Sequence, residues 1–202
     1  MTRMFIAFEG GDGAGKSTQV QLLADALRAR GETVIVTREP GGSPVAEKIR
    51  DVVLDIANLG LDDRSEALLY AASRAEHVAK VVRPALERNE VVITDRYMDS
   101  SIAYQGAGRG LGVERIEELN LWATQGLQPD FVIILDVEPQ HGLSRVEDPN
   151  RLEEESTEFH AVARKAFLTR ASQNPAKYLV LNARDDINTI SVAILEAVLK
   201  KF

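Results

Sequence analysis

The chain contains no cysteine among its 202 residues, which excludes disulfides, thiolate catalysis and metal or iron–sulfur sites held by cysteine. Its three histidines, His77, His141 and His160, lie too far apart along the chain to suggest a metal-binding motif. No uninterrupted apolar run is longer than residues 67–72, whereas a helix that spans a bilayer needs about 20 apolar residues. The apolar residues 4–8 are likewise too few for the core of a signal peptide. These absences favour a soluble, cytoplasmic protein that does not enter a membrane.

Basic residues are also in short supply. The 24 lysines and arginines are outnumbered by 31 aspartates and glutamates, which gives a net charge of −7. Nonspecific binding to nucleic acid needs a basic face that meets the phosphate backbone, so a nucleic-acid polymer is not an expected partner. Small anionic ligands remain open, because a local cluster of arginines overcomes a weak overall field.

Apolar runs that resemble strands alternate with helical stretches along the whole chain. The runs are continuously apolar at their centres, as in residues 132–135, which is typical of strands buried on both faces of a parallel sheet. The strand candidates are residues 4–8, 33–37, 90–94, 131–136 and 178–181. Apolar residues at helical spacing follow the first strand (Val20, Leu23, Leu27) and the last one (Ile187, Ile190, Ile194, Val198).

This alternation predicts an α/β fold of three layers, in which helices flank a five-stranded parallel sheet. Two glycine- or polar-rich stretches, Asn58–Asp63 and Gly106–Gly112, are predicted to be loops, and neither is long enough to link two domains. We therefore expect residues 1–202 to form a single domain.

Residues 10–17, Gly-Gly-Asp-Gly-Ala-Gly-Lys-Ser, fit the phosphate-binding pattern G-x-x-x-x-G-K-[ST] between a predicted strand and a predicted helix. Glycines let the backbone curl so that N–H groups point at phosphate oxygens, and the helix that follows adds its positive end. Lys16 would reach the β- and γ-phosphates, and the Ser17 hydroxyl would bind Mg²⁺. The alternative is a plain glycine turn with Lys16 in solvent. The residues expected to contact ATP here are Gly10, Gly11, Asp12, Gly13, Ala14, Gly15, Lys16, Ser17 and Thr18.

A phosphate-binding loop needs an acid near the magnesium ion, and two predicted strands end in one. Asp95 follows residues 91–94, and Asp136 follows residues 131–135. Asp95 is the better candidate because Arg96 comes directly after it, and an arginine there suits charge neutralisation during phosphoryl transfer. Asp136 is interpreted as an ordinary residue of the turn that ends its strand.

Four blocks of sequence together resemble bacterial thymidylate kinases. They are residues 8–18 (FEGGDGAGKST), 37–42 (TREPGG), 95–97 (DRY) and 101–106 (SIAYQG). Their order and spacing match that family, and the similarity runs along nearly the whole chain. The resemblance implies a P-loop kinase that transfers the γ-phosphate of ATP to dTMP with Mg²⁺, giving dTDP on the route to dTTP.

The resemblance also implies how the acceptor nucleotide is held. Asp12 would bind the sugar 3′-hydroxyl, Arg38 and Arg96 would bind the acceptor phosphate, and Tyr104 would crowd the 2′ position and disfavour ribose. Two arginines that approach one anion form charge-assisted, often bidentate hydrogen bonds. The catalytic charges would come from Lys16 and Arg96. Arg38 could instead only cap a loop.

The same resemblance assigns four residues to the thymine ring. Tyr70 would lie under the ring, Arg74 would meet O4, and Ser101 and Gln105 lie in the block that contacts the base edge. Tyr70 and Arg74 are four residues apart, which puts them on one face of a helix. The alternatives are that Tyr70 is a core aromatic residue and that Arg74 pairs with a carboxylate such as Glu66 or Glu76.

Kinases of this type close a mobile lid over ATP and bring arginines to the phosphoryl group. The lid expected here, about residues 142–156, is short and contains only two arginines. Arg145 resembles the arginine that packs on adenine, which leaves Arg151 as the third expected catalytic residue. The acids of the segment are Glu147, Asp148, Glu153, Glu154 and Glu155, of which residues 153–155 are interpreted as a solvated helix start. The family also implies a homodimer.

Other functions predict other residues. A P-loop GTPase switch would carry Asn-Lys-x-Asp and an Asp-x-x-Gly after a strand, but the chain's Asp-x-x-Gly lies inside residues 12–15. A deoxynucleoside kinase tends to have Glu-Arg-Ser where residues 95–97 are Asp-Arg-Tyr. A kinase for another nucleoside monophosphate stays open, whereas a noncatalytic ATP-binding scaffold leaves Arg38, Arg74 and Arg96 unexplained.

Overall fold

The computed structural model describes residues 3–146 and 149–201, so the lid acids Glu147 and Asp148 lie outside the described residues. Its strands form one sheet in the order β2-β3-β1-β4-β5, and every neighbouring pair is parallel. The strands are β1 (Met4–Gly10), β2 (Val34–Arg38), β3 (Val91–Asp95), β4 (Phe131–Asp136) and β5 (Tyr178–Asn182). The predicted fold class is confirmed, and the strand bounds agree with the prediction to within two residues.

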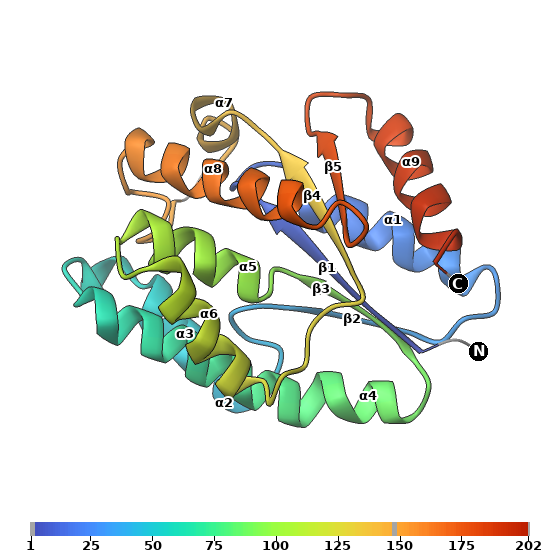
Figure 1. The fold of residues 1–202 in the computed structure, drawn as a ribbon, viewed down its shortest axis with the longest axis horizontal. Helices are drawn as coiled ribbons and strands as arrows, with labels where there is room; N and C mark the ends of the chain where they lie inside the picture. The colour runs from blue at the N-terminus through green and yellow to red at the C-terminus, as the bar shows by residue number, and fades with distance from the viewer. Residues whose placement is uncertain (1–2, 147–148, 202) are drawn as a thin grey trace.

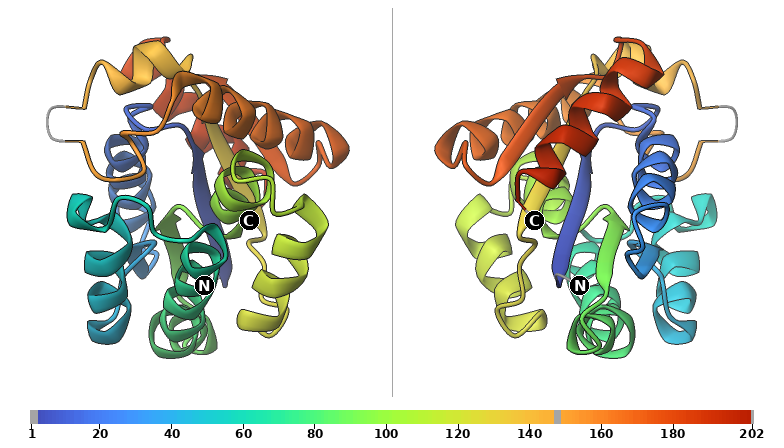
Figure 2. Two further views of the ribbon diagram at one scale, coloured as in Figure 1. Left: turned by 90° about the vertical axis from the view of Figure 1, so that its left-hand side faces the viewer. Right: turned by 90° about the vertical axis from the view of Figure 1, so that its right-hand side faces the viewer.

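Helices connect the strands and cover both faces of the sheet (Figures 1 and 2). The α-helices are α1 (Lys16–Arg28), α2 (Pro44–Leu54), α3 (Asp63–His77), α4 (Arg83–Glu87), α5 (Met98–Ser101), α6 (Val113–Ala123), α7 (Pro139–Leu143), α8 (Thr157–Gln173) and α9 (Ile187–Leu199). Shorter helical segments are the 3₁₀ helix η1 (Ile56–Asn58) and the π-helical η2 (Val78–Val82) and η3 (Ile102–Gly108). In the described residues, no helix has both the length and the apolar character needed to cross a membrane.

The alternation of side chains along β1 divides the core into two layers. Met4, Ile6 and Phe8 face one side, where they pack with the predicted apolar faces of α1 and α9. Phe5 and Ala7 face the other side, where they pack with residues of η2, α4, α5, η3 and α8. Because strands β1, β3 and β4 are covered on both faces, their sequences are continuously apolar until the polar residues near their carboxyl ends.

The predicted loop Gly106–Gly112 is wrong in its first part, because η3 continues to Gly108. Its glycines serve close packing. A Cβ on Gly108 would lie 2.6 Å from the Phe159 ring, and one on Gly106 would lie 3.2 Å from the Cα of Val113. Glycine is therefore needed here so that a helical segment can lie against α6 and α8.

The prediction that the acidic residues 153–155 begin a helix is wrong. Helix α8 begins at Thr157, and the Ser156 hydroxyl accepts a hydrogen bond from the Phe159 N–H. A serine N-cap satisfies a backbone donor that the first helical turn leaves free. Glu155 is instead paired with Arg109 at 2.6 Å, and Glu153 is half-buried. Residues 153–155 therefore belong to the segment that precedes α8.

Candidate active site

One cavity of about 620 Å³ lies at the carboxyl ends of the strands, where open parallel sheets bind their ligands. Three of the expected site residues, Gly10, Gly11 and Arg151, do not line it. The expected residues that do line it are Asp12, Gly13, Ala14, Gly15, Lys16, Ser17, Thr18, Arg38, Tyr70, Arg74, Asp95, Arg96, Ser101, Tyr104, Gln105 and Arg145. Segments that are far apart in sequence therefore meet around a single space.

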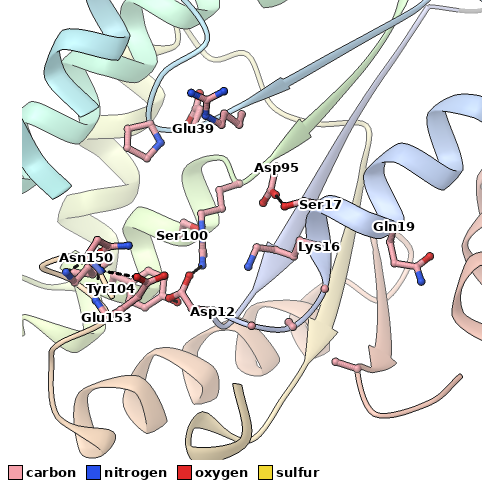
Figure 3. Close-up of a pocket in the computed structure, with 18 of the residues that line it drawn as sticks. Asp12, Lys16, Ser17, Gln19, Glu39, Asp95, Ser100, Tyr104, Asn150 and Glu153 are labelled. Atoms are coloured by element: carbon pink, nitrogen blue, oxygen red, sulfur yellow. Dashed lines mark hydrogen bonds and ion pairs between the residues drawn. The ribbon is translucent and has the colours of Figure 1, made fainter. Parts of the chain in front are cut away.

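The phosphate-binding loop connects β1 to the first turn of α1. Gly13 has φ +70°, and a Cβ there would lie 2.0 Å from the Gly142 carbonyl oxygen, so the loop packs tightly against α7. Lys16 is buried and donates to the carbonyl oxygens of Gly11 at 2.7 Å and Gly10 at 3.2 Å. Burial and the nearby charge of Arg96 lower the pKa of Lys16. The ammonium group is thus held inside the loop, pointing into the cavity (Figure 3).

Ser17 and Asp95 face each other on one side of the cavity (Figure 3). The Ser17 hydroxyl donates to Asp95 Oδ2 at 2.9 Å. Within residues 3–146 and 149–201, no group of three or more acidic or histidine side chains could hold a metal by itself. Mg²⁺ prefers oxygen ligands, often one or two carboxylates together with substrate phosphates and water. The hydroxyl and carboxylate pair therefore fits Mg²⁺ only in combination with a phosphate ligand.

Arg96 is the centre of a polar cluster opposite this pair. Its guanidinium donates to Asp12 Oδ1 at 2.5 Å and to the Ser100 hydroxyl at 2.9 Å, and it lies over the Tyr104 ring. The Tyr104 hydroxyl also donates to Asp12, at 3.3 Å. Burial alone would raise the pKa of Asp12, but Arg96 and then Lys16 hold it below its usual value. Asp12 is therefore an ionised acceptor at the cavity wall.

The backbone of Arg96 adopts a strained conformation beside the cavity. Its φ is +70°, a left-handed conformation that costs a residue with a side chain about 1–3 kcal/mol. Glu9 holds the residues that follow Arg96 in place. It is fully buried and accepts hydrogen bonds from the N–H groups of Tyr97 and Ser100 and from the Ser100 hydroxyl. Burial and the nearby Asp99 raise the pKa of Glu9 to about 8.

Two further arginines reach the cavity from β2 and α2. Arg38 ends β2 and pairs with Glu47 at 2.9 Å in an exposed contact. Arg50 donates to the Pro40 carbonyl oxygen at 2.8 Å, and its pKa is lowered by burial and by Arg38. With Arg96, these residues make one side of the cavity cationic although the whole chain is acidic.

Comparison with known proteins identifies the family. The family model for thymidylate kinase matches residues 8–194. Thymidylate kinases from Limosilactobacillus fermentum and Clavibacter sepedonicus are 46% and 51% identical over 204 and 187 residues, covering 98% and 91% of this chain and 95% and 88% of their own. The crystal structure of a thymidylate kinase from Ehrlichia chaffeensis matches with a TM-score of 0.81 at 34% identity, covering 98% of this chain and 99% of that one. The chain belongs to the thymidylate kinase family.

In this member of the thymidylate kinase family, the expected base-contacting residues come from α3, α5 and η3. Tyr70, Arg74, Ser101 and Gln105 are all buried side chains that line the cavity. Arg74 is the most constrained of them. It donates to Glu39 Oε2 at 2.6 Å, to the Ser101 hydroxyl and the Tyr97 carbonyl at 2.9 Å, and to Asn120 Oδ1. The carboxylate that pairs with it is therefore Glu39, and not Glu66 or Glu76 as the alternative interpretation had it.

These bonds make Arg74 a structural residue whatever else it contacts. Replacing it in Arg74→Ala would leave Glu39, whose side chain is 2% exposed, without its cationic partner. Breaking a buried ion pair on one side costs about 3–5 kcal/mol, so we expect the free energy of unfolding to fall by that amount. Urea unfolding measures it, with Arg64→Ala, an exposed site on the same helix, as the control. An unfolding midpoint equal to that of the control would contradict the prediction.

Arg151 is one of the three expected site residues that do not line the cavity. Its side chain is buried, donating from Nη2 to Glu66 at 2.5 Å and from Nε to the Val53 carbonyl at 2.9 Å. The sequence suggested a catalytic lid cation because few other basic residues are nearby. In the structure a buried carboxylate on α3 binds it instead, so the placement beside the phosphates is corrected. Arg145 does line the cavity, where it contacts the Gly13 carbonyl and His141.

Several cavity residues were not expected from the sequence. Arg50 is one, since its helix begins at Pro44 and nothing local shows which way the arginine faces. Glu153 is another, because its backbone segment carries it to the side of Asp12 and Tyr104 (Figure 3). Burial and the charge of Asp12 raise the pKa of Glu153. The cavity is also lined by Ala183, Asp185, Ile187 and Ile190. The sequence could have indicated them as site residues because they follow the last parallel strand, and ligands bind at the carboxyl ends of such strands.

Proposed function

We propose that this protein transfers the γ-phosphate of ATP to dTMP, giving ADP and dTDP for dTTP synthesis. One observation carries the proposal: a single cavity combines a phosphate-binding loop with a second cationic wall formed by Arg38, Arg50 and Arg96. Two anion sites in one space suit a reaction between two nucleotides. The kinship with thymidylate kinases supports dTMP as the acceptor.

The cationic side chains are proposed to hold the two phosphate groups in line. Lys16 binds the β- and γ-phosphates, and Arg96 with Arg38 binds the acceptor phosphate. An oxygen of the acceptor phosphate attacks the γ-phosphorus, and the bond from that phosphorus to the bridging oxygen of ADP breaks. Fixed cations aimed at the charge that spreads over the transferring group lower the barrier without reorganisation.

Mg²⁺ is the cofactor we propose, with Ser17 binding it directly and Asp95 through water. When bound, it supplies positive charge to the phosphate oxygens. The hydrogen bond between these two side chains supports the assignment because it brings a hydroxyl and a carboxylate to one point. Asp136 is occupied differently: Arg164 donates to both its oxygens, at 2.6 and 2.9 Å.

The sugar and the base of dTMP are proposed to bind beyond Arg96. Asp12 accepts from the 3′-hydroxyl, and the Tyr104 ring fills the space that a ribose 2′-hydroxyl would need. Tyr70 stacks on thymine, while Arg74, Ser101 and Gln105 contact its edge. All of these side chains line the same cavity as the phosphate-binding loop.

ATP is proposed to enter along the loop, with its adenine on the planar guanidinium of Arg145. Guanidinium groups stack well on flat rings. The opposite wall would come from cavity-lining residues after β5 and in the first turn of α9, which are Ala183, Asp185, Ile187 and Ile190. Residues 142–156 are proposed as the lid of one kinase domain that spans residues 1–202, working in the cytoplasm.

We also propose that the protein is a homodimer. Exposed apolar side chains lie on α2, on η1 and its C-cap residue, and on α3, and a second copy would cover them. They are Val45, Val52, Ile56, Leu59 and Leu68.

A coupled assay of ADP release with different acceptors tests the function. We expect kcat/KM for dTMP to exceed that for dCMP by at least ~10-fold, since Arg74 donates to thymine O4 but would face an amino group on cytosine. Activity should require Mg²⁺ and disappear with EDTA. Equal or higher kcat/KM with AMP, CMP or a deoxynucleoside would contradict the proposal.

A further inference from the structure

Glu66 is a buried carboxylate that lies beside the proposed base site without lining the cavity. It is in the first turn of α3 and is fully buried. Tyr70 follows it by four residues, so the two side chains project from the same face of the helix. A buried carboxylate needs partners for both of its oxygens, and those of Glu66 come from two other segments of the chain, the end of η3 and the segment before α8.

One of these partners is the side-chain amide of Gln105, whose Nε2 donates to Glu66 Oε1 at 2.9 Å. The others are two arginines. Arg109 contacts both carboxylate oxygens at 3.1 and 3.3 Å, and Arg151 contacts Oε2 at 2.5 Å. Burial alone would raise the pKa of Glu66, but hydrogen bonds from Arg109, Gln105 and Arg151 hold it below its usual value. The group is therefore ionised and accepts hydrogen bonds only.

An acceptor of this kind determines which way the Gln105 amide lies. Only the NH₂ end can face an ionised carboxylate, so the carbonyl oxygen must be at the other end. Gln105 lines the cavity beside Tyr70 and Ser101, and among the described residues its Oε1 has no hydrogen-bond donor. The polar atom that Gln105 offers to a base is therefore an acceptor.

We propose that Glu66 is a specificity-determining positioning residue: it fixes Gln105 so that Oε1 accepts from a base with a protonated ring N3. Thymine and uracil carry this N3–H, whereas N3 of cytosine is itself an acceptor. Two acceptors that face each other in a closed site leave both without a partner and weaken binding. The inference rests on the proposed function and names how the acceptor base is chosen.

The ion pair with Glu66 gives Arg151 a role that differs from the expected catalytic one. Arg151 and Arg109 balance the charge of Glu66, and Arg109 also pairs with Glu155 at 2.6 Å. The backbone N–H of Arg151 donates to the Leu54 carbonyl at 3.1 Å. Residues 151–155 are thus tied to α2 and α3 at the carboxylate that orients Gln105. Arg151 keeps that carboxylate ionised and so acts on base choice through Glu66.

The test compares kcat/KM for dTMP, dUMP and dCMP in Glu66→Gln. A glutamine at this position can donate as well as accept, so the Gln105 amide is free to turn. We expect the dTMP:dCMP ratio to fall at least ~10-fold, while the dTMP:dUMP ratio stays unchanged because thymine and uracil share the N3–H. A role confined to folding would lower activity with all three substrates equally, and unchanged ratios overturn the inference.

Two more variants keep the test decisive. Gln105→Met leaves Glu66 and both arginines in place and should lower the dTMP:dCMP ratio as much as Glu66→Gln, with no further fall in the double variant. An unchanged ratio in Gln105→Met overturns the inference even when Glu66→Gln fails to fold.

Asp63→Asn is the matched control. The Asp63 carboxylate also pairs with Arg109, at 3.3 Å, but is half-exposed, so the substrate ratios of this variant should equal those of the wild type. Failure of the wild type to phosphorylate dTMP would instead refute the proposed function.

Discussion

The variant Lys16→Met is expected to lower kcat by ~10³-fold while the fold stays intact. Removing one preorganised donor at a transition-state charge typically costs about 10²–10³ in kcat, and Lys16 carries a full positive charge. Within the described part of the chain, its ammonium group donates hydrogen bonds only to the carbonyl oxygens of Gly10 and Gly11. Methionine has nearly the same length and is apolar, so the buried stem can keep its packing.

Steady-state kinetics together with thermal unfolding check this result. Lys48→Met on α2 is the control, since Lys48 is exposed and makes no contact with the cavity. It should leave both kcat and the melting temperature near the wild-type values. A folded Lys16→Met enzyme with near-normal kcat would show that the loop does not hold the transferring phosphate.

The second large effect is expected for Arg96→Ala, which should lower kcat/KM for dTMP by ~10³-fold or more. Arg96 is the cation bound to Asp12, Ser100 and the face of Tyr104. Its loss removes the charge that holds the acceptor phosphate, and it also leaves the Asp12 carboxylate without its closest partner. Saturating dTMP should not restore the rate if the arginine acts mainly in the transition state.

The variant Arg96→Gly separates the side chain from the strained backbone. Glycine adopts φ +70° without penalty, so Arg96→Gly should unfold at a higher denaturant concentration than Arg96→Ala, by about 1 kcal/mol in the free energy of unfolding. Both variants should be equally inactive. If Arg96→Gly recovered activity, the contribution of this position would be conformational, and the guanidinium would not bind the phosphate.

Features that depend on contiguous residues could be predicted from the sequence. The phosphate-binding loop is one, because the glycines, the lysine and the flanking strand and helix are all encoded within residues 4–28. The central parallel strands β1, β3 and β4 were recognised for a similar reason: a strand covered on both faces needs an unbroken apolar run. Asp95 and Arg96 were found because a strand end is local, and parallel strands end at the same edge of a sheet.

What the tertiary structure decided is which distant groups meet. Arg151 and Arg74 were both recognised as important arginines, but their partners, Glu66 and Glu39, lie 85 and 35 residues away along the chain. Nothing in the spacing of charged residues distinguishes a phosphate ligand from half of a buried ion pair, since both need a cation. The difference depends on which carboxylate the packing of α2, α3 and the segment before α8 brings within hydrogen-bond distance, and on the burial that makes an unpaired charge there too costly to keep.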